Sequence, residues 1–314
     1  MRAGRTFVLA SLAAAVGGSV SGCSFEITGL VPSDVRDGDS MSGDDATVPI
    51  DAEPDAIVLG AWGTPVPVGL TPPDSGEDDG TLTGDLLELY LNRTGTGGSD
   101  IFRATRTDAT SAWGTPAIVT QLSSASAETT PEISTDGLRM VFASDRPGGT
   151  GNTDIWMSTR ANRAAPWGTP AVVAALNTAT SEAGGASPDG LTIVFSSFRK
   201  SNTSPDLYLA ERATLAATWG TPTELAALNT TGHDGSPFLS NDKLAIYFDS
   251  DRGGSMDIYV STRASVTDAF GAPVPVEGLA TSANEQDPWL SPDGRQLYFQ
   301  CDCGGPTGLW RVSR

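Results

Sequence analysis

Five acidic residues recur along the chain at intervals of 51 to 54 residues: Glu77, Glu128, Glu182, Asp234 and Glu285. We call these five the ring acids. Carboxylates that face one another repel, which favours a bound cation, a cationic group of a partner, or raised pKa values. Two carboxylates about 5 to 9.5 Å apart could also act as the acid and the nucleophile or base of a glycosidase. The simpler alternative is that each carboxylate accepts N–H bonds within its own loop.

A few residues break this regularity, and a single specific site is expected among them. His233 is the only histidine, which excludes a multi-histidine metal centre, and a solvated loop position beside Asp234 is favoured over a catalytic base. Glu285, close to Trp289 in sequence, is the best-placed catalytic acid. Cys301-Asp302-Cys303 could form a disulfide or remain a thiol pair. No metal site or cofactor is predicted, with calcium left open, because the acidic segment of residues 34–55 lacks EF-hand spacing.

Arginines recur with the same period. A charge pair that closes a hairpin is the natural interpretation of the first series, in which each arginine precedes an aspartate across a Gly-rich or Ser-rich turn. The expected pairs are Arg93 with Asp100, Arg146 with Asp154, Arg199 with Asp206, and Arg252 with Asp257. In the fifth unit Cys303 and Gly308 replace both partners together, as expected of a structural pair. A second series, which we expect to cap the blade edges, consists of Arg106, Arg160, Arg212, Arg263 and Arg314.

Two further markers show that the chain is built from repeats. Trp62-Gly63-Thr64-Pro65 returns at Trp113, Trp167 and Trp219, and in degraded form at Phe270. An Asp-Gly turn occurs in Ser187-Pro188-Asp189-Gly190 and has four counterparts, at 134–137, 291–294 and, more weakly, 83–85 and 240–242. Five copies of each marker predict five units of about 52 residues.

Each unit reads as four short strands separated by turn residues. In the second unit these are 131–134, 138–145, 154–160 and 167–176. The second strand is apolar at consecutive positions, as in Ile193-Val194-Phe195, so both faces of its sheet must be buried. Four-stranded sheets that stack around an axis are the blades of a propeller.

The last unit stops after its third strand, and residues 62–70 would supply the missing fourth strand and close the ring. We therefore predict an all-β, five-bladed propeller, with an open array or a six-bladed ring as the alternative. In such a ring, the ring acids lie at the mouth of the central channel.

These motifs resemble the TolB-like β-propeller repeat, a relative of the WD-type repeat. The shared features are Ser-Pro-Asp-Gly, an apolar strand ending in Ser-Asp-Arg, and Asp-Ile-Tyr; they read here as Ser250-Asp251-Arg252 with Asp257-Ile258-Tyr259. The resemblance covers residues 57–314 and implies the fold more firmly than a function, because propellers of this type serve as binding scaffolds, envelope partners or enzyme domains.

The segment before the repeats predicts where in the cell the protein is located. Arg2, Arg5 and an apolar stretch from Phe7 to Val16 read as a signal peptide over residues 1–22. Val20-Ser21-Gly22-Cys23 resembles a bacterial lipobox, which implies lipidation of Cys23, and Ser24 favours the outer membrane. Residues 23–56 carry nine acids and one base, so they read as a disordered tether before the propeller of residues 57–314.

The charge composition excludes some classes of binding partner. The formal net charge is -19, so nucleic acid and bare anionic lipid are poor partners, and membrane contact is expected only through the lipid anchor. No nucleophile elbow, phosphate loop or paired-histidine motif is present. We expect a noncatalytic, lipid-anchored envelope scaffold that binds a protein through its channel mouth. A lectin holding one sugar per blade on the repeated acids and tryptophans, and a glycoside hydrolase, are the alternatives.

Overall fold

The structure is a computed structural model that describes residues 60–314 apart from 72–75, 95–97, 187, 202 and 304–306. All of these residues belong to one unit, Ile57–Arg314. The predicted signal peptide, Cys23 and the tether lie outside the described residues. Within the described part the chain forms twenty strands and no helix, so no helix there has the length and apolar character of a membrane span.

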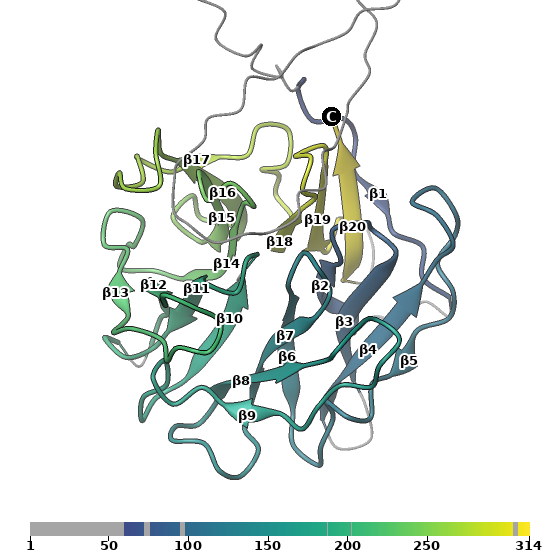
Figure 1. Ribbon diagram of the computed structural model, residues 1–314. Coiled ribbons are helices and arrows are strands. Elements are labelled where there is room, and N and C mark those ends of the chain that lie inside the picture. Colours follow the sequence, from purple (N-terminus) through teal and green to yellow (C-terminus); the bar gives the residue numbers. More distant parts are fainter. Residues whose placement is uncertain (1–59, 72–75, 95–97, 187, 202, 304–306) are drawn as a thin grey trace, which may run out of the picture. The chain divides into compact units, whose positions relative to one another are not determined.

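The twenty strands form five antiparallel sheets of four strands arranged around a common centre (Figure 1). The innermost strands are β2 (Asp78–Leu82), β6 (Glu128–Ile133), β10 (Glu182–Ala186), β14 (Asp234–Leu239) and β18 (Glu285–Leu290). The second strands are β3 (Glu88–Thr94), β7 (Arg139–Ser144), β11 (Thr192–Ser197), β15 (Ala245–Ser250) and β19 (Gln296–Cys301). The third strands are β4 (Ser99–Thr105), β8 (Asp154–Thr159), β12 (Asp206–Glu211), β16 (Asp257–Thr262) and β20 (Gly308–Ser313). The outer strands are β5 (Ala117–Ile118), β9 (Ala171–Val172), β13 (Thr223–Glu224), β17 (Val274–Pro275) and β1 (Val66–Pro67).

The five innermost strands define the channel, because each contacts the next and β18 contacts β2. The second strands carry the core between blades. Phe142, Phe195, Phe248 and Phe299 occupy equivalent positions and are at most 1% exposed. Since these strands are buried at consecutive positions, both faces of each sheet are covered by neighbouring blades. The all-β, five-bladed prediction is confirmed, and the six-bladed ring and the open array are excluded.

The outer strands are much shorter than the ten residues predicted for residues 167–176. The glycine of each Trp-Gly-Thr-Pro marker still donates to the end of the third strand, as Gly168 N does to Thr159 O at 2.9 Å. Two residues later Pro170 has no N–H to donate, so regular pairing is confined to Ala171–Val172. An edge position tolerates this interruption because the outer side of the strand needs no further partner in the sheet.

The two ends of the chain close the ring, as predicted. Strand β1 pairs with β20, placing Val66 opposite Arg311, and Figure 1 shows the two strands side by side. Gly63 N donates to Ser313 O at 2.9 Å, and the Arg314 guanidinium lies 4.2 Å from the centre of the Trp62 ring. The last residue of the chain therefore stacks on the first marker of the repeat.

We expect Trp62→Ala to lower the free energy of unfolding by about 2 kcal/mol, because it removes half-buried aromatic surface and the cation–π contact that holds the ring closed. Urea denaturation measures this value. Val274→Ala, at a side chain that is 56% exposed, is the control and should change stability by less than about 0.5 kcal/mol. Equal stability of the two variants would show that the joined ends do not support the ring.

Candidate functional site

The ring acids are buried side chains within their own blades, each at most 6% exposed. Glu128 shows the arrangement: it accepts hydrogen bonds from the Ser124 backbone N–H at 2.8 Å, the Ser124 hydroxyl at 2.5 Å and the Ser144 hydroxyl at 3.0 Å. Glu182 and Asp234 have the same kinds of partner. The structure therefore matches the simpler alternative, in which each carboxylate serves its own loop, and the ring acids do not form a free negative ring.

The first arginine series has a different partner from the one expected. Arg146 Nη2 lies 2.8 Å from Glu128, and the corresponding distances are 3.6 Å for Arg199 with Glu182 and 2.5 Å for Arg252 with Asp234. Arg93 pairs with Glu77 in the same way, although it lies directly opposite Asp100 in the β3–β4 register.

The expected hairpin pairs do not form at Arg146, Arg199 and Arg252, for a reason of register. Ser144 is the residue opposite Asp154, so Arg146 lies two residues beyond the ladder and turns toward the innermost strand. Asp154 instead accepts N–H bonds from Thr150 and Gly151 in the turn, and Asp257 accepts a hydrogen bond from the Ser255 hydroxyl. Asp206 occupies the matching position opposite Ser197.

The second arginine series packs on the aromatic marker of its own blade. The guanidinium carbons of these five arginines lie 4.2 to 4.6 Å from the ring centres of Trp113, Trp167, Trp219, Phe270 and Trp62. Each Nε also donates to a backbone oxygen of the turn between the first two strands, for example Arg212 to Gly190 O at 2.6 Å. The repeated tryptophans are thus used for packing and are not free to hold a sugar in every blade.

The fifth blade departs from this pattern. Cys301 and Cys303 form a disulfide, and no arginine among the described residues pairs with Glu285. Burial raises the pKa of Glu285 to about 7. Trp289 lies apart from Glu285, in the core, where its ring packs edge-on against Phe238 and Tyr298.

A separate acidic cluster lies on the channel axis, and the sequence had not singled it out. Each innermost strand carries a residue with a left-handed backbone two positions after its ring acid, where the strand pairing shifts register. These residues are Asp79 (φ 51°), Thr130 (46°), Gly184 (65°), Ser236 (42°) and Asp287 (52°). Such backbone is unfavourable for most residues other than glycine, less so for aspartate and asparagine. The bulge recurs in all five blades and places these positions where neighbouring innermost strands meet, as the bonds from Thr130 N to Asp79 and from Gly184 N to the Thr130 hydroxyl show.

Only blades one and five place carboxylates at this position, so the cluster is one-sided. Oxygens of Asp78, Asp79 and Asp287 lie within 4.8 Å of one another. Asp249 joins them from the second strand of the fourth blade by accepting the Asp287 N–H at 3.3 Å. Thr130 N donates to Asp79 at 3.1 Å, which links the cluster to the second blade. We call Asp78, Asp79, Asp249 and Asp287 the axial cluster.

The environment of the axial cluster disfavours several negative charges at once. Burial, followed by the charge of Asp78, raises the pKa of Asp79 well above its ordinary value. Burial and the charges of Asp79 and Asp78 do the same for Asp287, and burial raises the pKa of Asp78. Oxygen ligands in this spacing suit a hard cation such as Ca²⁺, and they equally suit an ammonium or guanidinium group.

His233 borders the axial cluster. Its Nε2 lies 2.9 Å from Asp249 Oδ1, so its partner is Asp249 and not the neighbouring Asp234. Burial acts to lower the pKa of His233, but the hydrogen bond to Asp249 and the charge of Asp249 outweigh burial and raise it. A Cβ at Gly235 would lie 2.3 Å from His233 Nε2, so only glycine at that position lets the imidazole reach the carboxylate.

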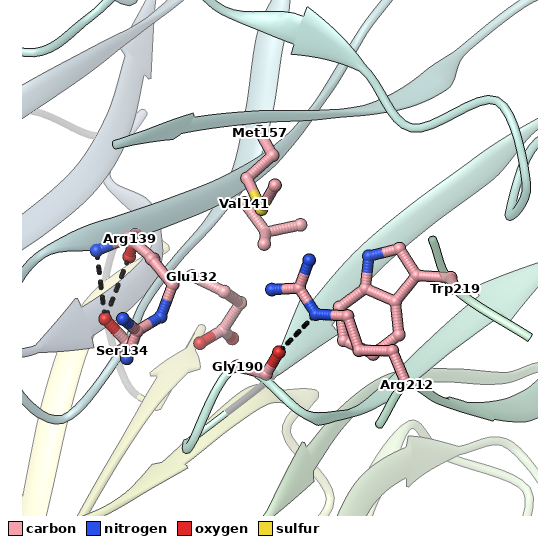
Figure 2. A pocket seen from close by; sticks show the side chains of 8 residues that line it. All are labelled: Glu132, Ser134, Arg139, Val141, Met157, Gly190, Arg212 and Trp219. Carbon is pink, nitrogen blue, oxygen red and sulfur yellow. Dashed lines mark hydrogen bonds between the residues drawn. The ribbon is translucent and has the colours of Figure 1, made fainter. Parts of the chain in front are cut away.

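Glu132 lines a small cavity between the second and third blades. Figure 2 shows its carboxylate between the Arg139 and Arg212 side chains, with Trp219 beside Arg212. The cavity volume of about 10 Å³ accommodates roughly one water molecule. Glu132 accepts the Thr81 hydroxyl at 3.1 Å, and burial raises its pKa to about 8.

Comparison with known proteins defines the fold class. No protein-family model and no curated protein matches the sequence. Among solved structures, the catalytic domain of a GH62 alpha-L-arabinofuranosidase from Coprinopsis cinerea is 12% identical with a TM-score of 0.55, covering 81% of this chain and 97% of that one. The alpha-L-arabinofuranosidase PaAbf62A from Podospora anserina is 13% identical with a TM-score of 0.54, covering 81% and 96%.

TolB structures are also among the structural neighbours. One from Agrobacterium tumefaciens is 20% identical with a TM-score of 0.48, covering 74% of this chain and 72% of that one. At these identities the arabinofuranosidase likeness shows the fold alone. The chain is a five-bladed propeller, and these likenesses assign it no function.

Proposed function

We propose that this chain is a noncatalytic binding scaffold whose channel mouth binds a cationic group of a protein partner. The observation that carries this proposal is the one-sided axial cluster, with three carboxylates within 4.8 Å of one another and a fourth hydrogen-bonded to Asp287. These are the acids that the repeat does not use for its own structure, since the ring acids accept loop hydrogen bonds and four of them pair with arginines.

A cationic group would relieve the repulsion within the axial cluster. Without one, Asp79 and Asp287 hold their protons well above the usual pH range of an aspartate, because charging them costs desolvation and mutual repulsion. A lysine, an arginine or a free amino terminus supplies a positive charge and N–H donors at the same time. Binding of the cationic group should therefore release protons from Asp79 and Asp287. The free energy needed to remove these protons lowers the affinity for the cationic group.

The proposed cellular location of this scaffold is inferred from sequence motifs. The lipobox-like motif at Cys23 and the acidic segment of residues 23–56 support a lipid-anchored protein of the bacterial envelope, with the outer membrane favoured. The TolB-like repeat motifs support a protein partner there. The carbohydrate-binding alternative loses its main support, because the repeated tryptophans and ring acids are used in packing.

The test compares the wild type with Asp79→Asn/Asp287→Asn. Asparagine has the shape of a protonated aspartic acid, and it tolerates a left-handed backbone, so the variant should fold. The probes are two acetylated peptides that differ only in a central lysine or norleucine. We expect the lysine peptide to bind more tightly to the wild type, and the variant to lose at least tenfold in affinity by calorimetry.

Asp108→Asn/Asp268→Asn is the matched control, because it makes the same two Asp-to-Asn substitutions at exposed residues. An equal loss of affinity in this control, or equal binding of the two peptides, would refute a cationic-group site. If the wild type hydrolyses an aryl arabinofuranoside and Asp79→Asn/Asp287→Asn does not, the chain is a glycoside hydrolase and the noncatalytic scaffold is refuted.

A further inference from the structure

The fifth blade keeps the backbone of the repeat but lacks its positive charge. Cys301 lies opposite Glu285, in the position that Ser144, Ser197 and Ser250 hold opposite their ring acids. Asp302 retains the role of Asp145, since it accepts the Asn284 N–H at 2.7 Å, where Asp145 accepts that of Ala127 at 2.9 Å. Cys303 thus occupies the place of the arginine that neutralises the ring acid in the second, third and fourth blades.

Glu285 is left as a buried carboxyl without a cationic partner. It is 1% exposed, and its Oε2 makes no hydrogen bond of normal geometry with a described residue. The other oxygen accepts the Thr281 hydroxyl at 2.6 Å and lies 3.8 Å from each of the two cysteine sulfurs. Burial, and after it the charge of the neighbouring Asp257 carboxyl, raises the pKa of Glu285. A buried carboxyl with an unsatisfied oxygen is costly unless a further group binds it.

We propose that reduction of the Cys301–Cys303 disulfide creates a binding site for a thiophilic divalent cation such as Zn²⁺, held by Cys301, Cys303 and Glu285. The cation binds the carboxylate that arginine pairs with in the second, third and fourth blades, and the two thiolates balance the cation's own charge. When the two sulfurs are bonded to each other, they have no thiolate charge to offer, and the cation is excluded. The site is separate from the axial cluster and does not depend on the proposed function.

The donor set suits zinc. Zinc binds thiolate sulfur and carboxylate oxygen in a tetrahedral arrangement, and three protein ligands leave its fourth position to water. The three donor atoms already lie within 4.8 Å of one another. Zinc–ligand bonds of about 2.3 Å to sulfur and about 2.0 Å to oxygen place sulfur and oxygen ligands roughly 3.5 Å apart, so the 3.8 Å separations need only a small adjustment.

The redox step balances with a dithiol as the reductant. A dithiol gives two electrons and two protons to the Cys301–Cys303 bond, which becomes two thiols, while the reductant becomes a disulfide. Binding of the cation then displaces the two thiol protons. Oxidation reverses the sequence, so the site responds to the redox poise of its compartment.

The test uses the full chain with Cys23→Ser, so that only Cys301 and Cys303 carry thiols. The protein is reduced with a phosphine, freed of reductant without oxygen, and titrated with Co²⁺ and then Zn²⁺. We expect one equivalent of Co²⁺ to give a thiolate-to-cobalt absorption band that Zn²⁺ abolishes, and the oxidised protein to give no band. Glu285→Gln should weaken Co²⁺ binding at least tenfold.

Cys301→Ser/Cys303→Arg is the matched variant, because it rebuilds the motif of the other blades and should fold with its ring acid neutralised. It should bind no Co²⁺, and Zn²⁺ should raise the Tm of the reduced parent but not that of this variant. The proposal is overturned if the folded protein resists reduction, if the reduced protein gives no thiolate band, or if Glu285→Gln binds Co²⁺ as tightly as the parent. Failure of Zn²⁺ to raise the Tm of the reduced protein would overturn it as well.

Discussion

Replacing Arg146 with methionine is expected to lower the free energy of unfolding by about 3 kcal/mol, because it leaves a buried carboxylate without its counter-charge. Glu128 is fully buried, and its salt bridge to Arg146 is 2.8 Å long. The Arg146 guanidinium carbon also lies 4.9 Å from the centre of the Phe142 ring and 5.3 Å from that of the Trp156 ring, and methionine keeps an apolar side chain beside these rings but loses the cation–π contacts. The expected loss of stability lies at the lower end of the range for breaking a buried ion pair, about 3 to 5 kcal/mol, because Glu128 keeps its hydrogen bonds to Ser124 and Ser144.

The second change that tests this interpretation is Glu128→Gln in the Arg146→Met background. Removing the carboxylate charge should restore most of the lost stability, because the cost arises from the unpaired charge and not from lost packing. Denaturant unfolding of the two single variants and the double variant completes the cycle. Arg295→Met, at an exposed arginine, should change stability by less than about 0.5 kcal/mol. A double variant no more stable than Arg146→Met would show that the arginine acts through packing alone.

Glu132→Gln is expected to stabilise the protein in alkaline solution and to have little effect in acid. The pKa of Glu132 is about 8 in the folded chain, raised by burial from its ordinary value near 4.5. Between these pH values the folded chain holds a proton that the unfolded chain has released. Stability from this group is therefore complete below about pH 4.5 and is lost as the pH rises toward 8.

Glutamine cannot ionise, so the variant should escape this loss. At pH 9 we expect Glu132→Gln to be more stable than the wild type by on the order of 3 kcal/mol, and at pH 4 the two should be nearly equal. Urea denaturation across this range measures the difference. Glu277→Gln removes one charge at an exposed position and serves as the control. A constant difference between Glu132→Gln and the wild type at all pH values would contradict a raised pKa at Glu132.

Residues that recur in every blade and residues that occur in only some blades have different roles in this protein. Residues that recur in every blade hold the propeller together, as the second arginine series does by stacking on the aromatic markers. Residues that break the repeat lie where a ligand could bind. The axial cluster is confined to blades one, four and five, and the Cys301–Cys303 disulfide to blade five.

The repeat could be read from the sequence because a propeller blade is a local structure. Its four strands are short and contiguous, so apolar strands and turn residues within one window of about 52 residues report them directly. Trp62 at one end and Arg311 near the other were enough to predict the closing pair, because counting strands needs no distances. The second arginine series was likewise visible as part of the scaffold because it recurs in every unit, but its stacking on the aromatic markers was not predicted.

The partners of the charged residues depended on tertiary structure. Register places Arg146 two residues past Ser144, which is the residue opposite Asp154, and Arg146 pairs with Glu128. The sequence spacing of arginine and aspartate had indicated a pair between Arg146 and Asp154 instead. The axial cluster was hidden for a similar reason. Asp79 and Asp287 are more than two hundred residues apart, and only a left-handed bulge in each innermost strand brings both to the channel axis. Periodicity of residue types reveals which strands form, but side-chain direction within a bulge depends on backbone angles that neighbouring blades impose.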